Sequence, residues 1–496
     1  MTETLGFCQE MRPESCGFVL FGATGDLAAR KIIPALFGLC DKGLAPRNFY
    51  MVLAARTPMD RGALEARLRD SVTKAGFTPA PDVFGAFLER LEYITADYDS
   101  DGFYGHLADR LAALDGKTGV NRKHLFYLAT PPAAFQPITA RLKTSGLLFD
   151  PKDCACWSRI IIEKPYGSSL ENAVALDAGL KLAAPESQVY RIDHFTGKET
   201  VQNVLALRSA NAVFEGTWNS GFVDHVQITV FEELGLEGRA AFFERMGLAR
   251  DMMSHILQLA AITAMDLPPT FRDTDFKAEK KRFFKSINPM TRDEVTRRTV
   301  RGQYAGYHGE PGVAADSAEE TFLAFKFQVD NDRWRGVPFY VRAGKKAGGK
   351  KTRIDLVYKK PDHGIFKHID IGYPNVFSFL IQPEEKVSFS LISKHPGPKL
   401  CFTPRTMGLD YLAEGQEAAG YPTDYERLLI EAMSGDQTLF LSSYEIAFMW
   451  EFLSPMLEAW TAAPQACPLH AYADGAPGPA AARELIEKDG RSWIQL

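Results

Sequence analysis

The sequence predicts an α/β protein with two domains: first a parallel, doubly wound sheet, then a β+α domain with a large, mainly antiparallel sheet. The chain has 496 residues, more than one hydrophobic core usually serves. Short β-rich runs alternate with helical patterns in its first part, whereas strand-like runs follow one another directly in its later part. We expect the boundary near residue 193, which gives domains at 1–193 and 194–496.

The strands predicted for the first domain are short runs rich in β-branched and aromatic residues. They are "GFVLFG" (17–22), "NFYMVLAAR" (48–56), "HLFYLAT" (124–130) and "SRIIIEKP" (158–165), and a helical pattern begins at Leu27. Strands that alternate with helices in this way are typical of βαβ units, whose strands run parallel.

The strands predicted for the second domain are separated mostly by turns. They are "DHVQITVF", "FYVRAG", "TRIDLVYKK", "NVFSFLIQ" and "KVSFSLIS", and long helices are expected at 424–434 and 443–461. Direct succession of strands favours antiparallel pairing.

The composition is that of an ordinary globular protein, with 46% hydrophobic and 24% charged residues. A net charge of −5 argues against nucleic acid or an anionic membrane as the main partner. No signal-peptide pattern opens the chain and no run of about 18 apolar residues occurs, so we expect a cytoplasmic protein. The seven cysteines are scattered without C-x2-C pairs, so we expect reduced thiols and no metal site.

A glycine turn follows the first predicted strand in "FVLFGATGDLAARK". Gly22, Gly25 and Ala28 are spaced three apart, and glycines let the backbone approach a pyrophosphate at a helix N-terminus. The pattern departs from G-x-G-x-x-G, and a turn that only packs a helix on a strand is the alternative. We expect a Rossmann-type dinucleotide site that comprises Gly22, Ala23, Thr24, Gly25, Asp26 and Leu27.

The second predicted strand ends in "LAARTP", where NAD-binding proteins often carry Asp or Glu for the ribose. Arg56 can pair with a 2′-phosphate instead, with Thr57 beside it, so NADP is the expected cofactor and NAD a weaker one. The alternative is that Arg56 is a solvated charge at a strand end.

The stretch "YRIDHFTGKE" (190–199) gathers two opposite charges, an imidazole and a glycine. Thr196 and Glu199 fit a capping box that would start a helix there. His194 and Lys198 would then lie at a helix N-terminus, a favourable place for an anion such as a sugar phosphate. A buried structural histidine and a surface lysine remain the alternative.

Two further segments carry polar groups in apolar surroundings. Lys164 follows a buried strand and precedes Pro165, where a cis bond would fix a bend, and it can reach a ligand at the carboxyl edge of the sheet. Asp251 and His255 lie four apart on an otherwise apolar helical pattern, where polar groups are costly unless paired or functional.

These motifs resemble the glucose-6-phosphate dehydrogenase family nearly end to end. The resemblance lies in "GATGDLAARK", "EKPYG", "RIDHFTGKETVQN", "EELGLEGRAAFFERMGLARDMMSHILQL", "VRAGKKAGGKK", "DYERLLIEAMSGDQTLF" and "DGRSW". It implies oxidation of C1 of β-D-glucose 6-phosphate to 6-phosphoglucono-1,5-lactone with hydride transfer to NADP, in the oxidative pentose phosphate pathway. It also implies a Rossmann-type coenzyme domain, a β+α domain, and a homodimer or homotetramer.

The resemblance also implies roles for individual residues. His255 matches the general base and Asp193 the carboxylate that orients it, a pairing that suits removal of a hydroxyl proton near neutral pH. The implied substrate-binding residues are Lys31, Lys164, His194, Phe195, Lys198, Glu232, Asp251, Lys345 and Gln382. Arg56, Thr57, Lys164 and Lys350 join the glycine turn on the cofactor side.

The chain departs from the family pattern at three places around this site, one of which is Thr196 in place of a usual Leu. Phe195 stands where many relatives carry Tyr, and the segment from Asp251 to His255 is one residue shorter than the pattern. We expect the shortening to displace Asp251 and leave His255 in place. Two rival functions stay open: a dehydrogenase acting on another sugar or sugar phosphate, and a catalytically weak regulator that binds a phosphosugar and NADP.

Overall fold

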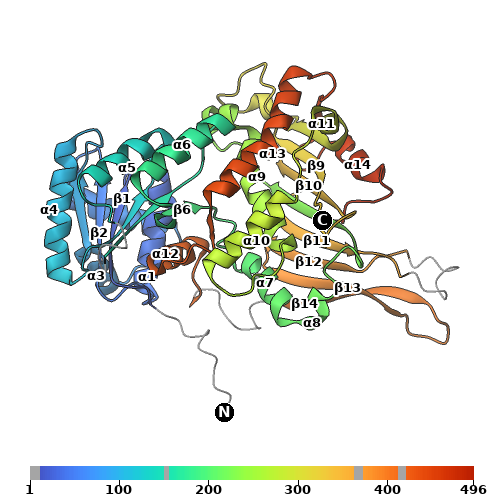
Figure 1. Ribbon diagram of the computed structural model, residues 1–496, viewed down its shortest axis with the longest axis horizontal. Coiled ribbons are helices and arrows are strands. Elements are labelled where there is room, and N and C mark those ends of the chain that lie inside the picture. Colours follow the sequence, from blue (N-terminus) through green and yellow to red (C-terminus); the bar gives the residue numbers. More distant parts are fainter. Residues whose placement is uncertain (1–11, 150–155, 362–371, 411–419, 496) are drawn as a thin grey trace, which may run out of the picture.

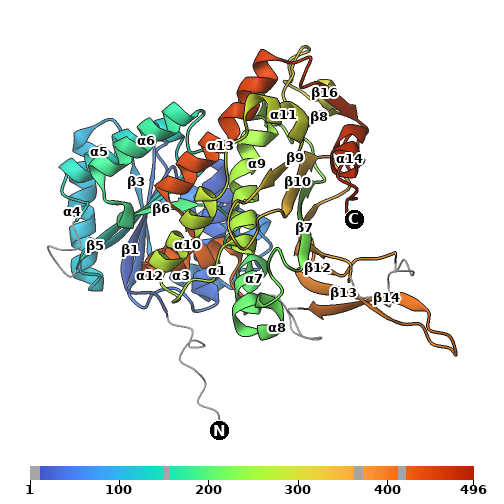
Figure 2. The ribbon, with the colours of Figure 1, turned by 45° about the vertical axis from the view of Figure 1, so that its right-hand side comes forward.

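The computed structural model describes residues 12–149, 156–361, 372–410 and 420–495. Two sheets dominate it, the first on the left of Figure 1 and the second on the right, with long helices between them in both views (Figures 1 and 2). This is the predicted combination of a Rossmann-type domain and a β+α domain. No helix of the described chain is both long and apolar enough to cross a membrane.

The first sheet has seven strands in the order β15-β6-β5-β4-β1-β2-β3. They are β1 (Cys16–Phe21), β2 (Phe49–Ala55), β3 (Leu91–Thr95), β4 (Lys123–Leu128), β5 (Trp157–Ile162), β6 (Val189–Ile192) and β15 (Phe440–Leu441). All neighbours pair in parallel except β15, which is antiparallel to β6. The order reverses between β1 and β4, the position where doubly wound sheets bind ligands beyond the carboxyl ends of their strands.

The second sheet has nine strands in the order β14-β13-β12-β11-β7-β10-β9-β8-β16. They are β7 (Val223–Glu232), β8 (Thr299–Tyr304), β9 (Phe322–Gln328), β10 (Pro338–Lys345), β11 (Lys351–Tyr358), β12 (Val376–Gln382), β13 (Lys386–Lys394), β14 (Phe402–Asp410) and β16 (Leu469–Tyr472). Only the pairs β7–β10 and β8–β16 are parallel. The sheet is therefore mainly antiparallel, as predicted.

The helices cover the two sheets and fill the space between them (Figure 1). Those of the first part are η2 (Ala28–Ile32), α1 (Ile33–Asp41), α2 (Arg61–Lys74), α3 (Pro81–Glu89), α4 (Asp101–Thr118), η3 (Pro132–Ala134), α5 (Phe135–Thr144), α6 (Leu170–Ala183) and η4 (Glu186–Gln188). The later ones are α7 (Glu199–Ala210), α8 (Ala212–Glu215), α9 (Ala240–Ala264), α10 (Asp273–Lys285), α11 (Arg292–Arg298), η5 (Tyr307–Gly309), α12 (Asp424–Ser434), α13 (Ser443–Ala462) and α14 (Ala480–Glu487). The two long helices expected at 424–434 and 443–461 are α12 and α13.

The late part of the chain returns to the first domain. Strand β15 extends the first sheet, and α12 packs against α1. The buried apolar side chains of α12 join the cluster on one face of the first sheet, and those of α13 join a second cluster that runs through both sheets. The two domains are therefore not separated completely at residue 193, because a later part of the chain belongs to the first domain. The predicted boundary does follow directly on β6, which ends at Ile192.

The cysteines follow the prediction only in part. Cys16, Cys40, Cys401 and Cys467 are free, and burial raises the pKa of the Cys16 thiol to about 12. Cys156, in contrast, is disulfide-bonded. The expectation of reduced thiols is therefore wrong for Cys156, because sequence spacing alone gave no sign of a bond there; Cys8 and Cys154 lie outside the described residues.

Candidate active site

The glycine turn has the geometry of a dinucleotide site. Gly22 adopts φ +81°, and a Cβ there would lie 2.3 Å from the Ala129 carbonyl oxygen. Gly25 donates to the Gly22 carbonyl at 2.9 Å, which closes a tight turn between β1 and η2. Glycine is thus required at the carboxyl end of β1 because the backbone at Ala129 lies against it, and the helical turns that follow offer N–H groups to an anion.

Two side chains that the sequence analysis missed brace this turn. The Tyr98 hydroxyl accepts from the Gly22 N–H at 2.8 Å and donates to the Ala54 carbonyl at 2.9 Å. Arg67 of α2 donates to the Thr24 carbonyl at 2.5 Å. Both belong to segments without a recognisable motif, so only the folded structure reveals them.

Arg56 and Thr57 lie just beyond β2, at the same edge of the sheet as Gly22, because β1 and β2 are parallel neighbours in register. Both side chains are exposed. Burial raises the pKa of Tyr98, which braces the glycine turn, and its hydrogen bond with Gly22 and the charge of Arg56 oppose this in part. Arg56 and the glycine turn therefore follow neighbouring strands at one edge of the sheet.

The centre of the site is a hydrogen-bonded chain of three side chains from different elements. Asp193 follows β6, His255 lies on α9, and Lys164 follows β5. His255 Nδ1 lies 2.5 Å from Asp193 Oδ1, and Lys164 Nζ donates to His255 Nε2 at 2.7 Å. The Lys164–Pro165 bond is cis, as the sequence suggested.

These contacts define the protonation state of His255. An ammonium group has only protons to give, so Nε2 must be the acceptor and the ring proton sits on Nδ1, facing Asp193. Burial, and then the Lys164 charge, lower the pKa of His255, while Asp193 offsets them in part. Burial alone would raise the pKa of Asp193, but His255 and Lys164 hold it below its usual range. A neutral imidazole oriented by a carboxylate is the resting form of a general base.

The two residues after Asp193 enclose this imidazole. The Phe195 ring stacks on the His255 ring at 4.2 Å, and its backbone N–H donates to Asp193 Oδ1 at 3.0 Å. His194 meets the edge of His255 at 4.7 Å. Burial, then the positive charge that His255 would carry if protonated and the charge of Lys164, lower the pKa of His194, so it is neutral and can donate one N–H to an anion.

Asp251 stays in the cluster, contrary to the expected displacement. Its carboxylate lies 3.4 Å from Lys164 Nζ, and its carbonyl accepts from the same group at 3.0 Å. The reason is that a spacing of four residues places Asp251 and His255 on one face of α9. Burial would raise the pKa of Asp251, but Lys164 and Lys345 lower it, so the carboxylate is charged.

Lys198 is buried, lies next to the cluster and stands at the N-terminus of α7, as predicted, but the predicted capping box is not present. Its Nζ donates to Asp424 of α12 at 3.0 Å. Lys198, not Thr196, is the N-cap of α7, and the Thr196 hydroxyl, which has one proton to donate, lies 2.6 Å from the Asp193 carbonyl oxygen and 2.5 Å from that of Leu439. The capping box of Thr196 with Glu199 is therefore not formed, since tertiary packing recruits the hydroxyl.

The remaining predicted residues fall into two groups. Lys345 of β10 pairs with Glu232 on the neighbouring strand β7, and Lys345 also acts on Asp251. Gln382 ends β12 and accepts from Thr352 at 3.4 Å, without a bond to the His255 cluster. Lys31 and Lys350 are exposed and make no ion pair with another described residue.

The same cluster has the ligand spacing of a metal site, because Asp193, His194 and His255 offer atoms within 4.8 Å of one another. The Lys164 ammonium, 2.7 Å from His255 Nε2, would repel a cation there. The arrangement fits proton transfer better than metal binding.

Comparison with known proteins places the whole chain in one family. The family model "Glucose-6-phosphate dehydrogenase, NAD binding domain" matches residues 19–203, and "Glucose-6-phosphate dehydrogenase, C-terminal domain" matches residues 205–494. Glucose-6-phosphate 1-dehydrogenase 2 of Mycobacterium tuberculosis is 38% identical over 493 residues, covering 96% of this chain and 94% of that protein. Glucose-6-phosphate 1-dehydrogenase of Bacillus subtilis is 35% identical over 490 residues, covering 96% and 98%.

Solved structures show the same architecture. A crystal structure of glucose-6-phosphate 1-dehydrogenase from Mycobacterium avium matches with a TM-score of 0.85 at 30% identity, covering 98% of this chain and 99% of that one. A glucose-6-phosphate dehydrogenase in complex with its substrate glucose-6-phosphate also matches with a TM-score of 0.85, at 29% identity over 98% of this chain and 100% of that one. The chain belongs to the glucose-6-phosphate dehydrogenase family.

Proposed function

We propose that the protein oxidises C1 of β-D-glucose 6-phosphate to 6-phosphoglucono-1,5-lactone and passes the hydride to NADP, as the first step of the oxidative pentose phosphate pathway. The observation that carries the proposal is the chain Asp193–His255–Lys164, in which His255 presents an unprotonated Nε2. A relative of the same fold is described in complex with glucose-6-phosphate.

In this mechanism the C1 hydroxyl replaces Lys164 as the donor to His255 Nε2. His255 takes the hydroxyl proton while the hydride leaves C1, and Asp193 stabilises the imidazolium that forms. Lys164 then binds the sugar or the cofactor, and we assign Asp251 and Lys345 to contacts with sugar hydroxyl groups. When bound, the nicotinamide ring would accept the hydride, and the N–H groups of the helical turns that begin at Ala28 would hold the pyrophosphate of such a cofactor.

We assign the sugar phosphate to His194, Phe195 and Lys198, and the remaining sugar contacts to Lys31, Glu232, Asp251, Lys345 and Gln382. We also propose 1–193 as the cofactor domain and 194–496 as the substrate and oligomerisation domain of a cytoplasmic homodimer or homotetramer. Family membership supports these assignments. Sedimentation velocity would test the oligomeric state.

The reaction can be tested by measuring the absorbance of the reduced nicotinamide cofactor as it forms. The assay would be run with NADP or NAD as the cofactor and with glucose, glucose 6-phosphate or another sugar phosphate as the substrate. We expect turnover with glucose 6-phosphate and little with glucose, because His194 and Lys198 have no anion to bind in glucose. Faster turnover of another sugar would favour the rival dehydrogenase. Tight binding of glucose 6-phosphate without any turnover would favour the regulator.

Replacement of Lys198 by Ala should raise the KM for glucose 6-phosphate at least about tenfold, since it removes a buried charge from a dianion site. Lys198 also anchors α12 through Asp424, so loss of docking alone could raise KM. Lys42→Ala is the matched control, because Lys42 pairs with Glu426 of the same helix at 2.6 Å. Equal effects of the two substitutions would refute the phosphate assignment.

We propose NADP over NAD because Arg56 stands at the strand end beside the glycine turn, where the 2′-phosphate would lie. A charge-assisted contact of about 1.5–3 kcal/mol corresponds to roughly ten- to a hundredfold in affinity. Arg56→Ala should raise the KM for NADP by that factor and change the KM for NAD little. Lys117→Ala, an exposed charge in the last turn of α4, is the control; a similar rise for both cofactors would show that Arg56 does not recognise the phosphate.

A further inference from the structure

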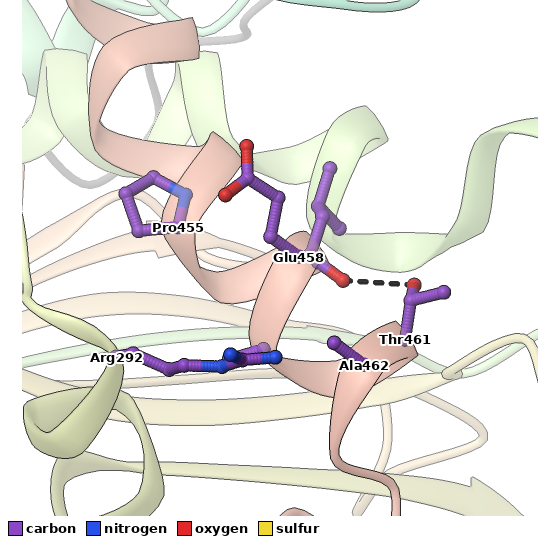
Figure 3. A pocket seen from close by; sticks show the side chains of 7 residues that line it. Arg292, Pro455, Glu458, Thr461 and Ala462 are labelled. Atoms are coloured by element: carbon purple, nitrogen blue, oxygen red, sulfur yellow. Dashed lines mark hydrogen bonds between the residues drawn. The ribbon is translucent and has the colours of Figure 1, made fainter.

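A second polar pocket lies outside the active site, between α11, β8, β16 and α14. Its volume is about 230 Å³, and Trp460 of α13 contributes to its wall. None of the residues assigned to catalysis or to the cofactor lines it. A more open hollow of about 620 Å³ lies along α13, but among the described residues that line it Arg292 is the one cation and Glu458 the one carboxylate (Figure 3).

Arg301 of β8 is the unusual residue of the 230 Å³ pocket. It is 9% exposed, and its Nε donates to the Cys467 carbonyl at 2.9 Å. The guanidinium lies 5.9 Å from the Trp460 ring, and no carboxylate of a described residue forms an ion pair with it. Burial lowers the pKa of Arg301 and the more distant Glu320 offsets this in part, so a positive charge is held in a place where water solvates it poorly.

Three further cationic or protonatable side chains line the same pocket: Arg297 of α11, His470 of β16 and Lys488 at the end of α14. None of them forms an ion pair with a described residue. Among the described residues that line the pocket, Glu484 is the one carboxylate, so permanent positive charge exceeds negative charge there. Uncompensated cations around a recess that contains a buried guanidinium raise the local potential for an anion.

We propose that this pocket binds a phosphate group, either as inorganic phosphate or as the monoester of a small metabolite. The free Nη groups of Arg301 supply the paired donors that phosphate oxygens accept, and Arg297 and Lys488 supply further charge. The volume is below the range of about 300–1,000 Å³ that drug-sized ligands occupy, so a dinucleotide does not fit. The site is separate from the phosphate position assigned to Lys198.

The test is calorimetric titration of inorganic phosphate into the full-length protein and its variants. Arg297→Gln changes an exposed side chain on a helix surface, and it should weaken phosphate binding at least about tenfold. The matched control is Arg298→Gln on the same helix, because Arg298 pairs with Glu294 at 3.0 Å and does not line the pocket. The control should bind phosphate within twofold of the unaltered protein, which is a difference in binding free energy of at most about 0.4 kcal/mol.

Binding of phosphate at Lys198 should be the same in the unaltered protein, Arg297→Gln and Arg298→Gln. A difference in phosphate affinity between them therefore reports the new pocket alone. Arg301→Gln should give the same loss, with circular dichroism to verify its fold. If Arg301→Gln does not fold, the double substitution of Arg297 and Lys488 by Gln replaces it. Unchanged phosphate binding in Arg297→Gln would overturn the proposal, and so would equal losses in Arg297→Gln and Arg298→Gln.

A second titration, with glycerol 3-phosphate, distinguishes the two sources of the phosphate group. Tighter binding than inorganic phosphate, lost again in Arg297→Gln, identifies a small phosphate ester as the ligand. Equal affinity, likewise lost in Arg297→Gln, identifies the phosphate group alone. Binding of either probe that is insensitive to Arg297 counts against the pocket.

Discussion

The enzyme with His255 replaced by Asn should lose at least about a hundredfold in kcat for glucose 6-phosphate oxidation, the usual worth of a general base. Asparagine is the choice because its amide can keep a hydrogen bond to Asp193 in the buried site while offering no basic nitrogen. The KM should change little, since the phosphate contacts assigned to His194 and Lys198 remain. Steady-state kinetics with both substrates varied would measure this split.

The chain offers a matched control for this substitution. His225 is also buried, and its Nδ1 lies 2.6 Å from Asp224, but it belongs to β7 outside the site. His225→Asn should leave kcat within about twofold, so a general effect of removing a buried His–Asp pair would be visible. Near-normal turnover in His255→Asn would remove the base assignment.

The acid side of the pH profile provides an independent check on the same residue. The base must be neutral, and burial lowers the pKa of His255 below the ordinary 6.5. Activity should therefore persist as the pH falls through 6.5 and decline only below it, as His255 becomes protonated. A decline in kcat/KM that begins above this value would mean that another group limits the reaction.

Much of the fold could be predicted because it rests on local patterns. Alternating strands and helices imply parallel pairing, and the carboxyl ends of parallel strands meet at one edge, which brought Gly22, Arg56 and Lys164 to one region. The apolar pattern of α13 likewise marked its extent. These inferences need no knowledge of which distant segments touch.

The features that the sequence did not predict depend on contacts between segments that lie far apart in the chain. Lys198 pairs with Asp424, 226 residues further along the chain, and the Thr196 hydroxyl bonds to the Leu439 carbonyl rather than to its own helix. β15 has two residues, too few for any sequence pattern to show, yet it returns the chain to the first sheet. Tyr98 and Arg67 brace the glycine turn from segments without a motif.

The shortening before His255 shows how geometry can reverse an inference from spacing. Removal of a residue from a helix rotates one part against the other by about 100°, which suggested that Asp251 had turned away. The structure has Asp251 and His255 one helical turn apart on the same face, with Lys164 bonded to both. Gly247, with φ +61°, interrupts α9 before Asp251. Asp251 and His255 therefore both belong to the helical segment that starts after this glycine.

Replacement of Asp193 by Asn should lower kcat by roughly a hundred- to a thousandfold, because loss of a preorganised electrostatic contact costs about 2.7–4 kcal/mol. The tautomer of His255 should survive. Asp193 Oδ1 accepts from both the Phe195 N–H and His255 Nδ1, whereas Oδ2 has no hydrogen-bond partner among the residues that the structure describes. An Asn that turned its amide toward Nδ1 would also set that NH₂ against the Phe195 N–H, two donors facing each other. The amide oxygen therefore stays in place of Oδ1, and only the charge that stabilises the imidazolium is lost.

The pH profile separates loss of charge from loss of tautomer. Asp193 raises the pKa of His255 against the effect of burial, so its removal should lower that pKa further. The acid limb of kcat/KM should then move to lower pH while the plateau falls. If the tautomer were lost instead, Nε2 would carry the proton, and the rate should fall by about ten-thousandfold, as in the Ser-His-Asp enzymes where that exchange leaves the wrong tautomer. A plateau reduced less than tenfold would show that Asp193 only positions the ring and that its charge contributes little to proton removal.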